Sequence, residues 1–288
     1  MLYLSEFSFP SAETEDDFLM SIRETCYTSF YPFGILTRHS LETIRFAGIT
    51  LLYGGNGCGK TTVLNIISEA LGLERSTLYN RSSFFEKYIE RCDYKLEKRI
   101  PKGSRIITSD DVFDYMLDLR SLNESIDYKR EDIFEEWVEN KFDTEFRFNS
   151  MEDFEKLRAI NKARSLSRSQ YTRRRLMNNV QEHSNGESAF IYFSDKIREN
   201  ALYLLDEPEN SLSPENQLEL YSFLEDSARF FGCQFIISTH SPFLLSMNNA
   251  FVYDLDAETA CRRRWTELPN VRAYYDFFKK HSKEFERE

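Results

Sequence analysis

One short stretch of the chain combines residue types that could bind phosphate. Residues 54–62 contain the pattern G-x-x-x-x-G-K-[ST]. They are Gly54, Gly55, Asn56, Gly57, Cys58, Gly59, Lys60, Thr61 and Thr62. Glycines let successive backbone N–H groups turn toward phosphate oxygens, and a helix that starts there adds its positive N-terminal end. We expect Lys60 to reach β- and γ-phosphates and Thr61 to hold Mg²⁺ through its hydroxyl. The alternative is a glycine-rich turn that binds nothing.

Two carboxylates, Asp206 and Glu207, follow a continuous apolar run from Ala201 to Leu205. We expect Asp206 to approach Mg²⁺, directly or through a water, and Glu207 to accept a proton from an attacking water or to orient it. An acidic pair at this place can also be a solvated loop.

Two further stretches could contact an anion. Ser184, Asn185, Gly186 and Glu187 combine small polar residues with an expected helix start, where the helix dipole favours negative charge. Taken alone, this stretch reads equally well as a helix cap. His240 follows an apolar run and offers an imidazole, although a single histidine at a strand end is often structural.

The elements that must hold these residues alternate between strand and helix. Strands are predicted at 49–53, 104–108, 201–205 and 234–238, and helices at 63–71, 215–230 and 242–246. Continuous apolar runs are typical of parallel strands that are buried on both faces. Ser213-Pro214 has the proline of a helix start. These patterns predict an α/β fold with a mostly parallel central sheet.

The other segments are less regular. Residues 1–53 are expected to be β-rich, residues 84–97 are a helix candidate, and residues 271–288 are charged, aromatic and expected to be helical. From Val112 to about His183 the pattern is strongly helical and charged, which predicts a helical insertion. Tyr31 or Phe33 could stack on a base, but packing in the core is the commoner role of such aromatic residues.

Composition limits the classes of protein and partner. The chain has 37 basic and 48 acidic residues and a formal net charge of −11, which argues against a generally nucleic-acid-coating surface but allows local basic patches. Arg164 to Arg175 is such a patch; it is either a solvated helix face or a contact for a phosphate-bearing partner such as nucleic acid. The five cysteines suggest neither a disulfide framework nor a zinc site. With no signal-peptide pattern or bilayer-length apolar run, we expect a cytoplasmic protein without direct membrane insertion.

The order of the four motifs resembles one superfamily. Four stretches of the chain are similar, in this order, to the Walker A, signature, Walker B and switch-histidine motifs of ATP-binding-cassette (ABC) ATPases. They are G-G-N-G-C-G-K-T, S-N-G-E, L-L-D-E-P and S-T-H-S-P. The likeness runs from about residue 30 to 255. The unusual signature and the stretch D-E-P-E-N-S-L-S-P resemble most the stand-alone soluble branch, which is related to SMC and DNA-repair ATPase heads and to phage-defence ATPases.

The resemblance implies a fold and a division of labour. The fold would be a P-loop NTPase with a RecA-like ABC core, an N-terminal β-rich portion and an inserted helical subdomain. Two subunits would enclose ATP and Mg²⁺ head to tail, with the Ser184 to Glu187 stretch of one subunit capping the γ-phosphate held by Lys60 of the other. Glu207 would be the general base, and His240 would contact the γ-phosphate. The implied enzyme is an ATP hydrolase.

The sequence departs from the family pattern at two places. No glutamine stands where the Q-loop pattern asks for one, and Asp110 is the nearest positional match, which could hold Mg²⁺ through water. Ser213 stands where many relatives have Asp. The segment between Lys60 and Ser184 is also too short for a long coiled-coil arm.

We therefore divide the chain into four parts: an N-terminal β portion with the first part of the core (1–111), a helical insertion (112–183), the second part of the core (184–270) and a helical tail (271–288). The implied function is an ATPase that dimerises on ATP and switches an effector, such as a nuclease, in DNA repair, DNA metabolism or phage defence. Alternatives are the ATPase subunit of a membrane transporter, or a nucleotide-binding switch with little turnover. The sequence identifies neither the effector nor the pathway.

Overall fold

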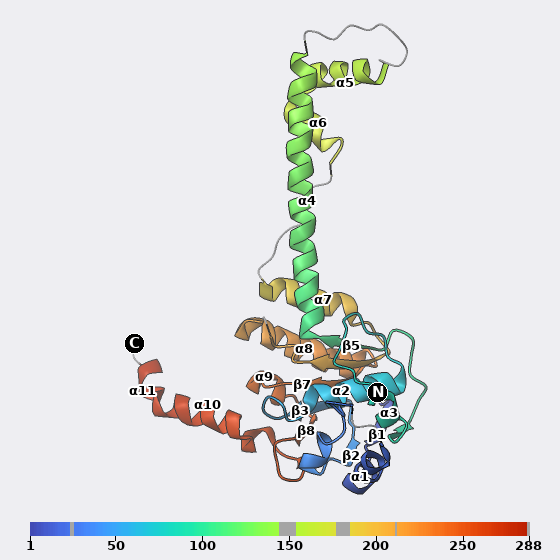
Figure 1. The fold of residues 1–288 in the computed structure, drawn as a ribbon. Helices are drawn as coiled ribbons and strands as arrows, with labels where there is room; N and C mark the ends of the chain where they lie inside the picture. Colours follow the sequence, from blue (N-terminus) through green and yellow to red (C-terminus); the bar gives the residue numbers. More distant parts are fainter. Residues whose placement is uncertain (24–25, 144–153, 177–184, 211, 287–288) are drawn as a thin grey trace. The chain divides into compact units, whose positions relative to one another are not determined.

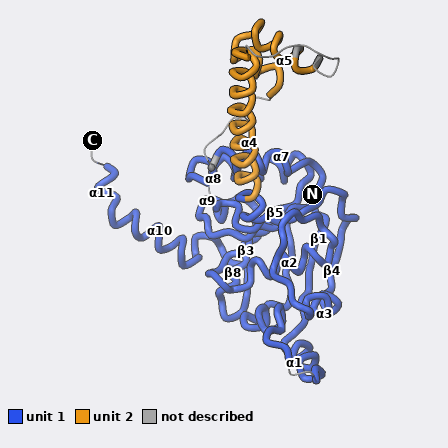
Figure 2. The backbone as a smooth tube through the Cα atoms, turned by 45° about the horizontal axis from the view of Figure 1, so that its top comes forward, with its two compact units in different colours: residues 1–113, 185–288 blue, residues 114–184 orange. Residues whose placement is uncertain are grey.

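The computed structural model describes residues 1–23, 26–143, 154–176, 185–210 and 212–286. Contacts divide the chain into two compact units: residues 1–113 with 185–288, here called the core unit, and residues 114–184, here called the helical unit (Figure 2). These are structural boundaries, and the functional division into four parts made above stays a prediction.

A six-stranded sheet with the order β5-β6-β7-β3-β8-β9 lies at the centre of the core unit (Figure 1). Neighbouring strands are parallel, except that β9 is antiparallel to β8. The strands are β3 (Ile49–Tyr53), β5 (Arg105–Thr108), β6 (Leu202–Asp206), β7 (Gln234–Ser238), β8 (Phe251–Asp254) and β9 (Cys261–Arg262). Every residue of β3, β6 and β7 is buried, because helices cover both faces of the sheet. The predicted α/β fold with a mostly parallel sheet is confirmed.

Helices surround this sheet and begin as their sequences predict. They are α2 (Lys60–Leu71), α7 (Asn185–Lys196), α8 (Pro214–Phe230), α9 (Pro242–Leu245), α10 (Pro269–Lys280) and α11 (Ser282–Phe285), with a short 3₁₀ turn, η3 (Trp265–Glu267). At the start of α8 the Ser213 side chain accepts a hydrogen bond from the Asn216 N–H, and Pro214 stands at the first helical position. Leu220 and Leu224 of α8 are fully buried.

A second, antiparallel sheet belongs to the N-terminal part of the core unit. Its order is β2-β1-β4, with β1 (Leu4–Ser8), β2 (Thr43–Arg45) and β4 (Asp93–Leu96). The helical elements beside it are α1 (Ala12–Ser21), η1 (Leu36–His39) and α3 (Phe85–Ile89). The predicted helix over 84–97 is therefore wrong beyond its first turns. Residues 93–96 pair with β1 instead, so a distant strand overrides the local helical pattern.

Gln234, at the start of β7, joins the two sheets. Its Oε1 atom accepts hydrogen bonds from the backbone N–H groups of Tyr3 (2.7 Å) and Leu4 (2.9 Å). Its Nε2 atom donates to the carbonyl oxygens of Leu4 (2.7 Å) and Ala47 (3.2 Å). The side chain is fully buried, and all donors and acceptors of its amide form hydrogen bonds between the two sheets.

The aromatic residues near the N-terminus form part of the core. Phe33 is buried, stacks on Phe18 at 4.7 Å and meets Tyr88 edge-on at 4.9 Å. Tyr31 stacks on Phe85 at 5.8 Å, and its hydroxyl lies 3.2 Å from the Thr62 hydroxyl. Phe33 thus has the packing role, whereas Tyr31 reaches from the core to Thr62, the third residue of α2.

The helical unit is built on one long helix. The helix α4 (Ser109–Phe142) has 34 residues, of which the first few belong to the core unit, and α5 (Phe154–Ser165) and α6 (Arg168–Arg173) follow it. The Trp137 indole N–H donates to the Leu166 carbonyl oxygen at 3.2 Å, and Tyr171 is buried with its hydroxyl 2.9 Å from Glu136. These contacts fasten the segment after α5 to α4.

Candidate active site

The phosphate loop connects β3 to α2 and turns at glycines. Gly59, directly before α2, has a φ of 103°, a left-handed conformation that non-glycine residues rarely adopt. A Cβ atom at Gly59 would also lie 3.0 Å from Leu36 and 3.1 Å from Ile35. The predicted strand, loop and helix are therefore all present, with the loop closed around the N-terminus of α2.

Lys60, the first residue of α2, points back into this loop. Its side chain is buried, and its Nζ atom donates hydrogen bonds to the carbonyl oxygens of Gly54 (2.8 Å) and Gly55 (3.1 Å). The same atom lies 2.8 Å from His240 Nε2 and 3.6 Å from Glu207 Oε1. The ammonium group thus connects the first loop with residues that follow β6 and β7.

Glu207 and His240 meet at this point. His240 Nε2 lies 3.3 Å from Glu207 Oε1, and Asn210 donates to the other carboxylate oxygen at 3.1 Å. Glu207 has a φ of 48°, which is strained for a residue with a side chain. Its N–H donates to the Ser238 carbonyl oxygen (3.1 Å) and lies 3.0 Å from the Ser238 hydroxyl. Ser238 in β7 therefore holds the turn that aims the carboxylate.

Asp206 is buried at the end of β6 beside two hydroxyl groups. The Ser238 hydroxyl donates to its Oδ1 atom, and the Thr61 hydroxyl also favours the ionised form of its carboxylate. Burial raises the pKa of Asp206, with a further contribution from the charge of Glu207, while the two hydroxyl groups and Lys60 lower it. Burial has the largest effect, so the hydroxyl groups and Lys60 only partly offset the cost of a negative charge on the carboxylate.

The oxygen atoms of Thr61 and Asp206 fit a magnesium ion. A hydroxyl and a carboxylate are hard oxygen ligands, and Mg²⁺ usually takes one or two such protein groups besides phosphate oxygens and water. A cation there would supply the positive charge that the buried Asp206 lacks. Thr61 and Asp206, two of the three residues predicted to hold the metal, are thus close enough for the Thr61 hydroxyl to lower the pKa of Asp206.

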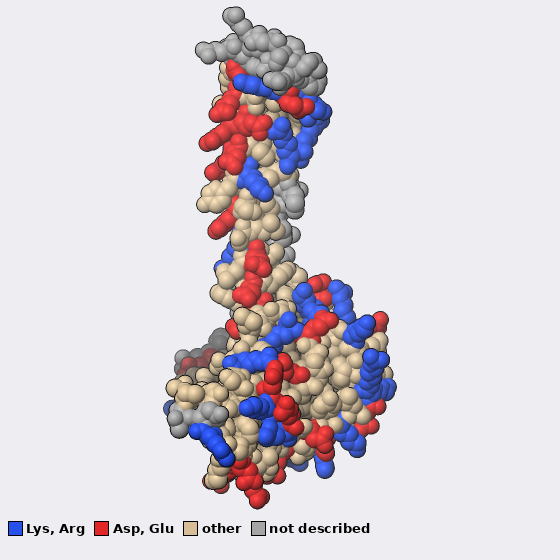
Figure 3. All heavy atoms as spheres, turned by 45° about the vertical axis from the view of Figure 1, so that its right-hand side comes forward, with Lys and Arg blue, Asp and Glu red and all other residues tan. Residues whose placement is uncertain are grey.

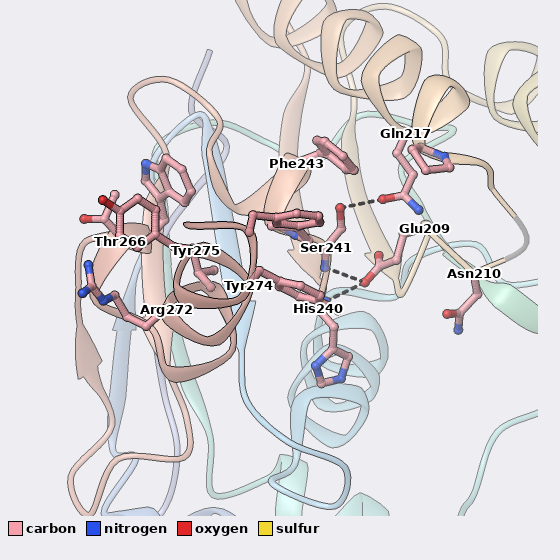
Figure 4. A pocket seen from close by; sticks show the side chains of 15 residues that line it. Glu209, Asn210, Gln217, His240, Ser241, Phe243, Thr266, Arg272, Tyr274 and Tyr275 are labelled. Atoms are coloured by element: carbon pink, nitrogen blue, oxygen red, sulfur yellow. Dashed lines mark hydrogen bonds between the residues drawn. The ribbon is translucent and has the colours of Figure 1, made fainter. Parts of the chain in front are cut away.

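Glu209 links the loop after β6 to the start of α9. Its Oε1 atom accepts hydrogen bonds from the backbone N–H groups of His240 (2.5 Å) and Ser241 (3.2 Å), as Figure 4 shows. Burial raises the pKa of Glu209, although the N–H groups of His240 and of Glu209 itself and the Thr239 hydroxyl oppose the shift. The Ser241 hydroxyl in turn donates to Gln217 of α8 at 2.7 Å. Glu209 therefore fixes the backbone that carries the His240 imidazole.

An apolar cleft lies beside His240 within the core unit. It has a volume of about 740 Å³, and α8, α9, η3 and α10 contribute to its walls (Figure 4). Tyr274, Tyr275 and Phe278 of α10 line it and are about half exposed. The cleft adds aromatic surface next to the charged cluster, and His240 lines both.

Only part of the predicted signature belongs to the described residues. Ser184 lies outside them, Asn185 and Gly186 are the first two residues of α7, and Glu187 stands exposed in its first turn. A helix does begin at this motif, as an anion-binding terminus requires. Its role as a cap on a nucleotide of a second subunit stays a prediction.

Asp110 is exposed in the first turn of α4, and among the described residues no contact brings it to Thr61 or Asp206. Its neighbour Asp111 is buried instead, and accepts from the Thr108 N–H (2.7 Å) and hydroxyl (2.8 Å). Since Thr108 is in register with Asp206, the helix start is near the site. A metal role of Asp110 stays a prediction without a contact to support it.

The basic patch Arg164 to Arg175 is partly engaged within the helical unit. Arg175 forms an ion pair with Glu136 at 2.7 Å, the Arg168 guanidinium lies over the Phe134 ring at 4.6 Å, and Arg164 donates to the Asp143 carbonyl oxygen. Figure 3 shows acidic and basic side chains close together on the visible face of this unit. These residues therefore stabilise their own unit first, which favours the solvated-face interpretation over a dedicated nucleic-acid site.

Sequence reasoning missed three residues of the site. Glu209 belongs to the D-E-P-E-N-S-L-S-P stretch, and Ser238 belongs to the predicted strand 234–238. Both residues therefore lie in recognised patterns, but nothing in the sequence assigned them a role. Asp256 was not singled out at all; its Oδ2 atom accepts a hydrogen bond from the Gly55 N–H at 2.5 Å. No local pattern could have indicated this contact, because it joins residues that are far apart in the chain.

Comparisons with known proteins agree with the motifs. Residues 139–246 match the model of a family described as "AAA domain, putative AbiEii toxin, Type IV TA system". No curated protein matches the chain. This family match is consistent with the resemblance to ABC-type ATPases related to SMC heads.

Three solved structures that the chain is similar to have low sequence identity. One is an Smc head domain with an extended coiled coil bound to the C-terminal domain of ScpA, from Pyrococcus furiosus: 13% identity, 98% of this chain, 100% of that chain, TM-score 0.45. Another is an SMC head domain from Thermotoga maritima: 12% identity, 91% of this chain, 99% of that chain, TM-score 0.41. The third is a nucleotide-free ATP-binding cassette from an ABC transporter: 16% identity, 81% of this chain, 90% of that chain, TM-score 0.38.

Proposed function

We propose that this protein is an ABC-type ATPase that binds Mg-ATP, dimerises head to tail and hydrolyses ATP to switch an effector. The observation that carries the proposal is the meeting of Lys60, at the start of α2, with Glu207 and His240, which follow β6 and β7. His240 Nε2 lies within 2.8 Å of Lys60 Nζ and 3.3 Å of Glu207 Oε1. Carboxylate, imidazole and ammonium at the N-terminus of α2 are the groups that phosphoryl transfer to water needs.

Each residue would have a distinct task. Lys60 and the N–H groups of the loop from Gly54 to Thr62, except that of Gly55, which donates to Asp256, would bind the phosphates. Glu207 would take the proton of the attacking water, and Asn210 holds its carboxylate in place. His240 would contact the γ-phosphate, and this contact would replace the one that His240 now makes with Lys60. Thr61 and Asp206 would hold Mg²⁺, whose charge stabilises the negative charge that develops on the phosphate oxygens.

The dimer completes the site in this proposal. Ser184, Asn185, Gly186 and Glu187 of a second subunit would bring the N-terminus of α7 to the γ-phosphate, which supplies further charge stabilisation. Hydrolysis would then release the second subunit and change what an effector, such as a nuclease, meets. DNA repair, DNA metabolism or phage defence in the cytoplasm is the setting we propose. None of the helices in the described part of the chain has the length and apolar character needed to cross a bilayer.

The test combines turnover with mass in solution. Wild-type protein should release phosphate from ATP in the presence of Mg²⁺, and Glu207→Gln should reduce this rate by about 10²- to 10⁴-fold, the usual size of general-base catalysis. Glu207→Gln should still bind ATP and shift from monomer to dimer, and Ser184→Arg in that background should abolish the shift. ATP binding with no turnover in the wild type would favour a nucleotide switch. Turnover without any dimer would refute the head-to-tail arrangement.

A further inference from the structure

Asp256 and Lys60 contact opposite sides of one peptide group in the phosphate loop. The carbonyl oxygen of Gly54 accepts from Lys60 Nζ at 2.8 Å, and the N–H of Gly55 donates to Asp256 Oδ2 at 2.5 Å. This carbonyl and this N–H belong to the same trans peptide, in which they point in opposite directions. The lysine therefore holds the peptide from the inner side of the loop, and the aspartate holds it from the outer side.

The position of Asp256 follows from the central sheet. Tyr53 of β3 is in register with Asp254 of β8, and the Leu255 N–H donates to the Tyr53 carbonyl oxygen at 2.8 Å. The Asp256 N–H then donates to Asp254 Oδ1 at 3.0 Å, and Asp254 itself is buried and paired with Arg263 at 3.2 Å. The strand pairing thus continues up to the phosphate loop and delivers the carboxylate to it.

Two adjacent glycines let the carboxylate approach. A Cβ atom at Gly54 would lie 3.3 Å from Asp256 Oδ1, and one at Gly55 would lie 3.3 Å from Asp256 Oδ2. Gly55 is not required by the phosphate-loop pattern, so the contact gives a reason for its identity. Two successive glycines also give this peptide unusual rotational freedom, which an external contact has to restrict.

We propose that Asp256 is a positioning residue of the phosphate loop: it fixes the Gly54–Gly55 peptide so that the Gly54 carbonyl oxygen faces Lys60 and orients the lysine amine. The inference rests on the proposed function, since it assigns the orientation of Lys60 to nucleotide binding. Asp256 does not compete with phosphate for the loop, because the N–H it accepts from points away from Lys60.

The first test is independent of nucleotide. Amide hydrogen exchange at Gly55 is measured by NMR in the nucleotide-free full chain, for wild type, Asp256→Ala, Asp256→Asn and Glu258→Ala. Glu258 is exposed in the same loop, so its substitution removes the same charge without touching the phosphate loop. We expect at least about tenfold faster exchange in Asp256→Ala, since a charge-assisted hydrogen bond is lost, a smaller change in Asp256→Asn and none in Glu258→Ala. Equal exchange in Asp256→Ala and wild type would overturn the proposal.

The second test measures Mg-ATP affinity by calorimetry for the same four proteins. We expect about tenfold weaker binding in Asp256→Ala, partial rescue by Asp256→Asn, whose amide oxygen still accepts, and wild-type affinity in Glu258→Ala, at unchanged melting temperatures. Unchanged or tighter binding in Asp256→Ala would overturn the positioning role, and so would an equal loss in Glu258→Ala. If the wild-type chain binds no Mg-ATP, the proposed function fails, while the Gly55 exchange rates still decide whether Asp256 holds the peptide.

Discussion

The imidazole of His240 and the ammonium of Lys60 form a direct contact, with 2.8 Å between Nε2 and Nζ. An ammonium group can only donate, so in a hydrogen bond between the two Lys60 Nζ is the donor and His240 Nε2 the acceptor. His240, which would sense the γ-phosphate, is therefore hydrogen-bonded here to Lys60, which would bind that phosphate. In our proposal, ATP separates the two side chains by bonding to both.

His240→Ala should lower turnover much more than it lowers ATP affinity. The imidazole would contact only the terminal phosphate, whereas the backbone of the phosphate loop would bind the whole triphosphate. We expect a loss of about 10²-fold or more in the rate, with affinity changed by less than about threefold. His281→Ala, in the exposed segment after α10, is the control and should behave as wild type. Equal turnover in the two variants would remove His240 from the mechanism.

Glu209→Ala should destabilise the protein and slow turnover together. The His240 N–H would lose its acceptor, which costs about 1–3 kcal/mol for a buried group, and the Ser241 N–H would keep only the Thr239 hydroxyl. Glu209→Gln keeps an acceptor oxygen and should have a milder effect. Chemical denaturation and steady-state rates measure both changes. Glu215→Ala, an exposed glutamate in the first turn of α8, should leave them unaltered; the same loss there would show that the effect is not local.

Thr61 and Thr62 provide a matched pair for the metal. The Thr61 hydroxyl lowers the pKa of Asp206, whereas the Thr62 hydroxyl lies beside the Tyr31 hydroxyl. Thr61→Ala should therefore abolish the additional thermal stabilisation that Mg²⁺ gives to the ATP-bound protein, and Thr62→Ala should keep it. Melting curves with ATP and either Mg²⁺ or EDTA make the comparison. A magnesium effect retained in Thr61→Ala would mean that the metal is held elsewhere.

Glu15 should make stability fall with rising pH. Its carboxylate is buried and accepts from the Gly34 N–H at 2.6 Å, and burial raises its pKa above the usual value of 4.5 despite this bond. The folded state then binds the proton more tightly than the unfolded state does. The resulting stabilisation is present below pH 4.5 and is lost as the pH rises through the folded-state pKa.

Glu15→Gln should remove this dependence and raise the melting temperature at pH 7, since a neutral amide avoids the cost of a buried charge and can still accept from Gly34. Melting temperatures from pH 4 to 8 for Glu15→Gln and for the exposed neighbour Glu13→Gln give the test. The prediction is wrong if Glu13→Gln and Glu15→Gln have the same pH profile.

Local patterns predicted the elements that carry the site, because those elements are buried and continuous. The apolar runs that lead to Tyr53, Asp206 and Ser238 predict strands regardless of what surrounds them. The motifs follow directly at the ends of these strands. Parallel strands bring those ends to one edge of the sheet, so the meeting of Lys60, Glu207 and His240 could be expected.

The errors and omissions concern contacts that depend on strand order or helix phase. Residues 93–96 became a strand only because β1 offers them a partner. Asp110 and Asp111 are adjacent in the sequence, and the first turn of α4 exposes one and buries the other. Asp256 reaches Gly55 because β8 lies next to β3 in the sheet, a neighbour relation that no spacing in the sequence encodes.

The Gln234 amide couples the stability of the two sheets of the core unit. If the N-terminal strand detached, the amide would lose its bonds to Tyr3 and Leu4 while it stayed at the buried start of β7. Each unpaired buried group costs about 1–3 kcal/mol, which is a sizeable fraction of the stability of a typical domain. The N-terminal sheet thus helps to stabilise β7, the strand that leads to His240, although its described residues contribute no side chain to the charged cluster.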